Sequence, residues 1–142
     1  MKNTILRSIG AGLAGIITGI VLSLLTDHIL QTLGVIPKDN LWVSPTIIWF
    51  ILLYRTVYNT LSCYVTAKLA PKRPMTHALV LGVIGTFVSI AGAIATRNMN
   101  LGPEWYAWTL AALTLPSAWL GGKLFVMKKF DIKKLEEAYK GN

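Results

Sequence analysis

Residues 49–67, WFILLYRTVYNTLSCYVTA, make up an apolar stretch that is long enough to cross a bilayer but carries an arginine near its middle. Steps of four, three and four residues return to the same side of an α-helix, so one polar face holds Arg55, Asn59, Ser62 and Thr66. A charge at this depth costs at least about 2.5–3.5 kcal/mol unless it is paired or hydrated. The rest of the chain must therefore shelter this face.

The composition of the whole chain is typical of a membrane protein. Of the 142 residues, 54% are hydrophobic and only 14% are charged, and the mean hydropathy is +0.54. Soluble domains are rarely so apolar. The five Trp and five Tyr residues are of the types that anchor helices at membrane interfaces.

Four apolar stretches predict an all-α fold, an integral membrane four-helix antiparallel bundle. The predicted helices cover about 5–25, 46–69, 76–96 and 105–127. They form one domain, 1–127, and a basic tail follows at 128–142. Pro71 and Pro74 break the chain between the second and third helices, which makes these two helices antiparallel neighbours. The pattern leaves open the structure of the long connection at 26–45.

Small residues recur at helical spacing on the first and third predicted helices. They are Ala11, Gly15, Gly19 and Ser23 on the first, and Gly82, Gly85, Ser89 and Gly92 on the third. Small residues let helices approach closely in lipid. We therefore expect the first and third helices to pack closely around the second.

The basic residues predict the orientation of the bundle. Eleven of them flank the helices on one side: Lys2, Arg7, Lys68, Lys72, Arg73, Lys123, Lys128, Lys129, Lys133, Lys134 and Lys140. Only Lys38 and Arg97 flank them on the other side. Basic loops stay in the cytoplasm, so both termini are expected there. This distribution argues against nucleic-acid binding, because no basic stripe lies on a soluble module.

The tail at 128–142 predicts a short amphipathic helix on the cytoplasmic membrane surface. Met127, Phe130, Leu135 and Ala138 form a weak apolar edge. The lysines Lys123, Lys128, Lys129, Lys133 and Lys134 would be attracted to anionic lipids, at about 1 kcal/mol each.

The sequence shows no constellation of catalytic or metal-ligating residues. The two histidines, His28 and His77, fall on opposite sides of the predicted membrane and cannot share a metal. The single cysteine, Cys63, lies in an apolar stretch, where thiols are usually unreactive. We expect neither an enzyme nor a bound metal or cofactor.

The residues that could bind something form a polar core around the second helix. The candidates are Asp27, Arg55, Tyr58, Asn59, Ser62 and Glu104. Arg55 could extend outward to Asp27 or to Glu104, the acids expected on the outer side. Three interpretations stay open: a structural ion pair, a water-filled pocket that binds an anionic group, and a contact with a partner protein.

Several motifs resemble those of small bacterial membrane proteins. They are YRTVY at 54–58, YVTAKLAP at 64–71, RPM at 73–75 with HAL at 77–79, GPEWY at 102–106 and PSAWLGG at 116–122. The chain resembles an uncharacterised family of four-helix integral membrane proteins of the bacterial inner membrane. The resemblance implies this location but no activity and no site residues.

These observations lead to three hypotheses of function, of which an intramembrane enzyme acting on lipid is the least favoured because no acid–base or metal constellation appears. The first is a non-enzymatic accessory or assembly protein that acts as a homo-oligomer or with a membrane-protein partner. The second is a small transporter or channel with a polar site around Arg55 that opens to the outer face.

Overall fold

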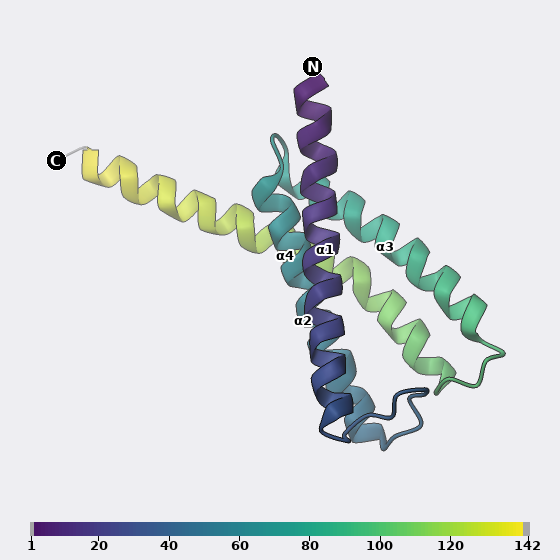
Figure 1. The fold of residues 1–142 in the computed structure, drawn as a ribbon. Helices are drawn as coiled ribbons and strands as arrows, with labels where there is room; N and C mark the ends of the chain where they lie inside the picture. Colours follow the sequence, from purple (N-terminus) through teal and green to yellow (C-terminus); the bar gives the residue numbers. More distant parts are fainter. Residues whose placement is uncertain (1, 141–142) are drawn as a thin grey trace.

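The computed structural model describes residues 2–140, and the side chains of residues 3–140. Met1, Gly141 and Asn142 lie outside the described residues, as does the side chain of Lys2, which the sequence analysis counted among the basic residues. The described chain is all-helical, with four helices and no strand (Figure 1): α1 (Lys2–Thr32), α2 (Pro45–Leu69), α3 (Pro74–Thr96) and α4 (Glu104–Lys140).

Three of these helices are long and apolar enough to cross a membrane: α1, α3 and α4. The 25 residues of α2 would also suffice by length. Arg55 and the polar residues that share its face lower the hydropathy of α2, and α2 is not among the candidate spans in the described chain.

The helices pack only in part as the small-residue pattern predicted. α1 lies on α2, α4 packs against both α2 and α3, and α1 and α3 hardly touch. The small face of α3 meets α4 instead, because Gly82 contacts Ala118 and Gly85 contacts Thr114. α3 also contacts α2, as the pattern predicted, but its main neighbour is α4.

Two loops meet at one end of the molecule, the lower end in Figure 1. The backbone N–H of Leu41 donates to the carbonyl of Leu101 over 2.6 Å, and the indole Nε1 of Trp42 donates to the carbonyl of Asn100 over 2.8 Å. The start of α1 and the turn at 70–73 lie at the opposite end. The loop at 33–44 is thus held by the loop at 97–103.

The first helix begins at Lys2 and ends at Thr32, so it extends three residues before and seven residues beyond the predicted range of about 5–25. Gly34 adopts a left-handed conformation with φ +72°, and the N–H of Val35 donates to the carbonyl of Leu30 over 2.9 Å. This is the usual glycine-dependent helix stop. Residues 26–32 therefore belong to α1, which brings Asp27 into the helix instead of the connection.

The fourth helix is also longer than predicted. It continues through Pro116 and through the predicted tail to Lys140, so residues 128–140 extend α4 and do not form a separate short helix. No proline or glycine interrupts residues 123–140. In Figure 1 this last part leaves the other helices and points away from them.

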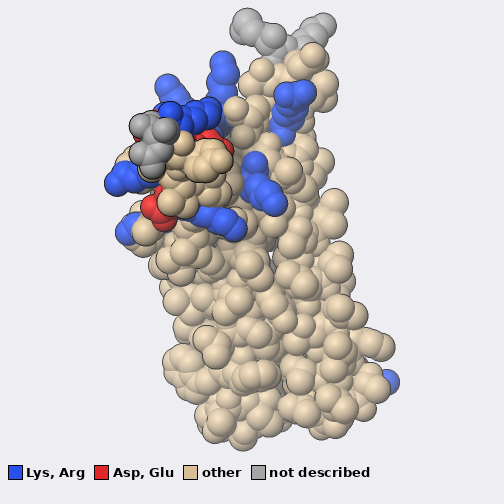
Figure 2. Space-filling view, turned by 90° about the vertical axis from the view of Figure 1, so that its left-hand side faces the viewer, with Lys and Arg blue, Asp and Glu red and all other residues tan. Residues whose placement is uncertain are grey.

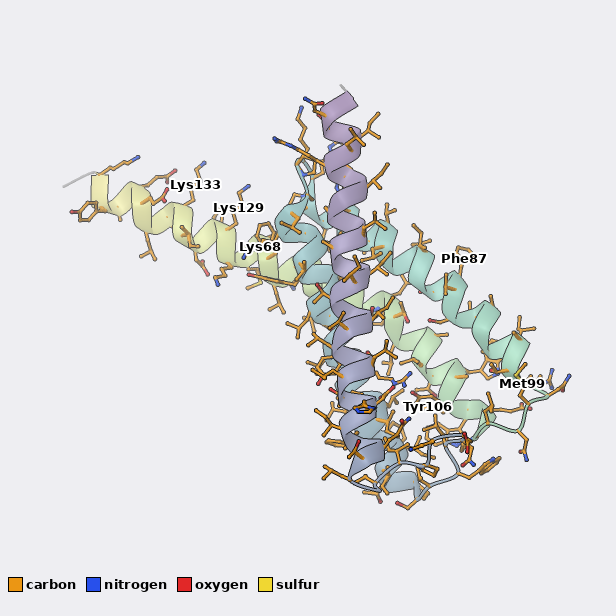
Figure 3. The ribbon with its side chains drawn as sticks, in the orientation of Figure 1. Lys68, Phe87, Met99, Tyr106, Lys129 and Lys133 are labelled. Carbon is orange, nitrogen blue, oxygen red and sulfur yellow. The ribbon has the colours of Figure 1, made fainter. Side chains whose placement is uncertain are left out.

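The surface of the helices is mostly apolar. Large hydrophobic side chains such as Phe87, which is 70% exposed, point away from the other helices (Figure 3). Exposed apolar areas of this extent are unusual on soluble monomers. Figure 2 shows an uncharged surface over most of one face, with Lys and Arg side chains gathered toward the end that holds the N-terminus.

Candidate functional site

The polar face of α2 is turned toward other helices rather than toward the surroundings. Ser62 and Thr66 are buried, and the Ser62 hydroxyl donates to the carbonyl of Gly15 on α1 over 2.5 Å. The Asn59 amide donates to the carbonyl of Thr114 on α4 over 3.4 Å. The face predicted from helical spacing is thus one continuous strip that contacts two neighbouring helices.

Arg55 is paired with Asp27. Its Nη2 lies 2.6 Å from Asp27 Oδ2, and the Tyr54 hydroxyl donates to the other carboxylate oxygen. The two charged side chains keep 30% and 19% of their surface exposed. Of the two acids that the sequence left open, the structure brings Asp27 to Arg55. Glu104 pairs with a different arginine: its Oε1 lies 3.5 Å from Nε of Arg97, and both of these side chains are mostly exposed.

Two tyrosines belong to the same region. Tyr58, a predicted site residue, shares a 2.9 Å hydrogen bond with Thr26 on α1. Tyr54 was not among the predicted site residues, yet it contacts Asp27 directly. The sequence could have indicated Tyr54, because it lies four residues before Tyr58 and residues at this spacing share a helix face.

A cavity of about 260 Å³ lies where α1 and α3 diverge, and its wall combines apolar and polar side chains. All four helices line it. Its polar lining consists of Ser23, Arg55, Thr56, Asn59, Ser62, Ser89, Thr114 and Ser117. The Thr114 and Ser117 hydroxyls donate to carbonyls of their own helix, which is how hydroxyls are satisfied without water. Arg55, Asn59 and Ser62 of the predicted site are therefore brought together at one cavity, and Asp27 is bonded to Arg55.

Two buried polar atoms among the described side chains have no hydrogen-bond partner: Nε of Arg55 and the hydroxyl of Tyr106. Both can donate a hydrogen bond, and a donor buried without a partner costs roughly 1–3 kcal/mol. Tyr106 belongs to the same hydrophobic cluster as Tyr54, close to the Arg55–Asp27 pair. The region around Arg55 therefore has spare donors for a polar group that the chain itself does not supply.

The arrangement can bind polar groups, and it offers no visible ligand set for a metal. Within residues 2–140, no three His, Cys, Asp or Glu side chains gather where a metal ion could sit. Cys63 is buried among Ala67, Ala78 and Ala118. Comparisons of the chain with protein-family models, with curated proteins and with solved structures found no match.

Proposed function

We propose that the chain is a four-helix antiparallel bundle of the bacterial inner membrane, with both termini in the cytoplasm. α2 would cross as a sheltered helix, because its polar side chains face α1 and α4 while the exposed residues along its middle are apolar. These are Trp49, Phe50, Leu53, Val57 and Leu61, and the exposed Thr46 and Lys68 lie near the two ends of the helix. The excess of basic residues at the N-terminal end supports this orientation.

We further propose that the protein works by binding and not by catalysis, as an accessory or assembly subunit. The observation that carries this proposal is the cavity that opens where α1 and α3 separate. Lipid chains cannot satisfy the donors that Arg55 keeps after its contact with Asp27, so the opening favours a polar occupant. A transmembrane helix with a hydrogen-bonding side chain fits, because polar side chains join helices inside membranes.

Photo-crosslinking in native membranes tests the proposal. A photoreactive amino acid would replace Ser89, which lines the cavity, or Phe87, which is 70% exposed on the same helix and serves as the matched control. We expect position 89 to crosslink to one defined membrane protein and position 87 to crosslink to lipid only. Crosslinks to lipid alone at both positions would contradict an assembly role.

The second candidate, a small transporter or channel with a polar site around Arg55 open to the outer face, has one observation in its favour. Arg55 lines both the cavity and a separate pocket at the loop end of the molecule. Labelling with an impermeant thiol reagent separates the two candidates. In a Cys63→Ser background, Asn59→Cys should react from outside in a transporter and should stay unlabelled in a sealed accessory protein.

The end of α4 is proposed to lie on anionic lipids at the cytoplasmic surface. Lys129 and Lys133 project from the part of α4 that leaves the bundle (Figure 3), and Leu135 is exposed on the same segment. Basic side chains on such a helix are attracted to anionic headgroups. In reconstituted vesicles, Leu135→Cys should react more slowly with a thiol reagent when the vesicles contain phosphatidylglycerol than when they contain phosphatidylcholine alone. Equal rates would argue against this contact.

A further inference from the structure

A pocket of about 220 Å³ lies at the loop end of the molecule, apart from the cavity between α1 and α3. α1, α2 and the loop at 33–44 line most of it. Its polar lining consists of Asp27, Gln31, Lys38, Asp39, Asn40 and Arg55. Arg55 also lines the cavity and is the one residue that the two linings share. The guanidinium therefore lies at the boundary between the two spaces.

The wall of this pocket is held in place by specific contacts. The Asn40 side chain accepts a hydrogen bond from the N–H of Trp42 over 3.1 Å, and Leu41 and Trp42 are bonded to the loop at 97–103. Gly102 packs so closely on Leu41 that a methyl group at position 102 would lie 2.9 Å from the Leu41 Cβ. The pocket is thus a feature of the folded loops and not a gap beside a loose segment.

Arg55 has hydrogen-bonding capacity left after its contact with Asp27. The ion pair uses Nη2, and 30% of the side chain stays exposed. Nε is buried without a partner, so the exposed part of the guanidinium is what a solute can reach. A guanidinium carries five N–H donors in a planar fork that matches the oxygens of carboxylates and phosphates. Lys38, which is exposed, adds a second positive charge to the lining, and Asp39 is exposed there as well. Asp27 is already bonded by Arg55 and Tyr54.

We propose that this loop-end pocket binds a small solute through an anionic oxygen, a carboxylate or a phosphate, which the exposed part of the Arg55 guanidinium holds. The proposal goes beyond the assembly role, because it concerns the loop-end pocket and does not require a partner between α1 and α3. Binding at this pocket also does not require that the solute crosses the membrane.

Thermal unfolding of the full chain in lipid nanodiscs tests the proposal. Sodium phosphate and sodium acetate would be titrated separately, with sodium chloride at matched ionic strength as the reference. In the wild type we expect phosphate or acetate to raise Tm above the value in chloride, with an effect that saturates as the concentration rises. The oxyanion that does so shows whether the pocket prefers a phosphate or a carboxylate. Arg55→Lys should weaken this binding at least about tenfold, because a lysine keeps the charge and loses the fork.

The matched control is Arg97→Lys, since Arg97 is also paired with a carboxylate at the loop end but is mostly exposed. It should bind the oxyanion as the wild type does. The proposal fails if neither oxyanion raises Tm more than chloride does, or if both variants weaken binding equally.

A labelling experiment covers the case in which Arg55→Lys does not fold. In a Cys63→Ser background, the active oxyanion should slow thiol labelling of Gln31→Cys, which lines the pocket, several-fold. It should leave the labelling of Asn98→Cys, exposed in the other loop, unchanged. Equal rates at position 31 with and without the oxyanion would overturn the proposal. None of these outcomes depends on the crosslinking at position 89, so this inference and the assembly role can fail separately.

Discussion

Two pairs of helices, α1 with α2 and α3 with α4, differ in the kinds of side chain at their contacts. Polar side chains join α1 to α2: Ser62 bonds the carbonyl of Gly15, Tyr58 bonds Thr26, and Asp27 accepts from Tyr54 and Arg55. Small residues also bring these two helices together, because Gly15 and Gly19 lie close to Ser62. Between α3 and α4 the close contacts are those of small residues, with Gly82 against Ala118 and Gly85 against Thr114.

The difference shows how the chain accommodates a charge among apolar helices. Hydrogen bonds and ion pairs are directional, so the contacts between α1 and α2 specify one register along the helices. Small residues specify only how closely two backbones approach, and their contribution is van der Waals packing. The contact between α1 and α2 supplies the partners that Arg55 needs, while the contact between α3 and α4 supplies close packing.

Reversing the charge of Arg55 should have the largest effect on the contact between α1 and α2. Arg55→Glu places a carboxylate next to Asp27, and such like-charge contacts cost several kcal/mol. We expect the variant to yield little folded protein, as measured by gel filtration after detergent extraction. Arg55→Leu is the control, because Asp27 keeps the Tyr54 hydroxyl and access to the loop-end pocket, and we expect it to fold. Wild-type folding of Arg55→Glu would show that Arg55 is not packed against Asp27.

Adding a methyl group to the small-residue contact should have the next largest effect. In Gly82→Ala the new methyl group would overlap the Cβ of Ala118, so the free energy of unfolding should fall by about 1–3 kcal/mol. Titration with a denaturing detergent measures this change. Gly92→Ala, on the same helix with open space at its Cβ position, should change stability by less than about 0.5 kcal/mol.

A second substitution sharpens this test. Ala118→Gly removes the methyl group that Gly82→Ala meets, so the double variant should regain part of the lost stability. If the double variant were no more stable than Gly82→Ala alone, the contact between α3 and α4 would not depend on these two residues.

Removing one hydrogen bond from the contact between α1 and α2 should have the smallest effect. Ser62→Ala loses the bond to the Gly15 carbonyl, and interhelical hydrogen bonds in membranes contribute about 0.6 kcal/mol on average. The same detergent titration measures the change, with Ser8→Ala as the control, because the Ser8 hydroxyl bonds only within its own helix, to the carbonyl of Thr4. A loss larger than that of Gly82→Ala would contradict the order of effects expected here.

Much of the fold was predictable because it depends on local patterns. The runs of apolar residues predicted four helices, and the described chain is all-helical with four helices. Their ends were less predictable. α1 continues past Asp27 until Gly34 offers a left-handed conformation, and α4 continues to Lys140 because no proline or glycine lies between Gly122 and Lys140.

The candidate site was predictable in part for the same reason. Helical spacing placed Arg55, Asn59 and Ser62 on one face, and they do line one cavity. The partner acid was not predictable, since Asp27 and Glu104 were both plausible from their positions along the chain. Tyr54 entered the site only through its contact with Asp27, which depends on how α1 crosses α2.

The amino-acid sequence by itself determined which segments are helices and which face of α2 is polar, because helix formation and helical spacing act over a few neighbouring residues. Only the tertiary structure decided that the small face of α3 packs on α4, that Asp27 and not Glu104 meets Arg55, and that a cavity remains between α1 and α3. The small faces of α1 and α3 have similar patterns, so the pattern alone does not choose their partners. The choice depends on how all four helices and their two touching loops fit together.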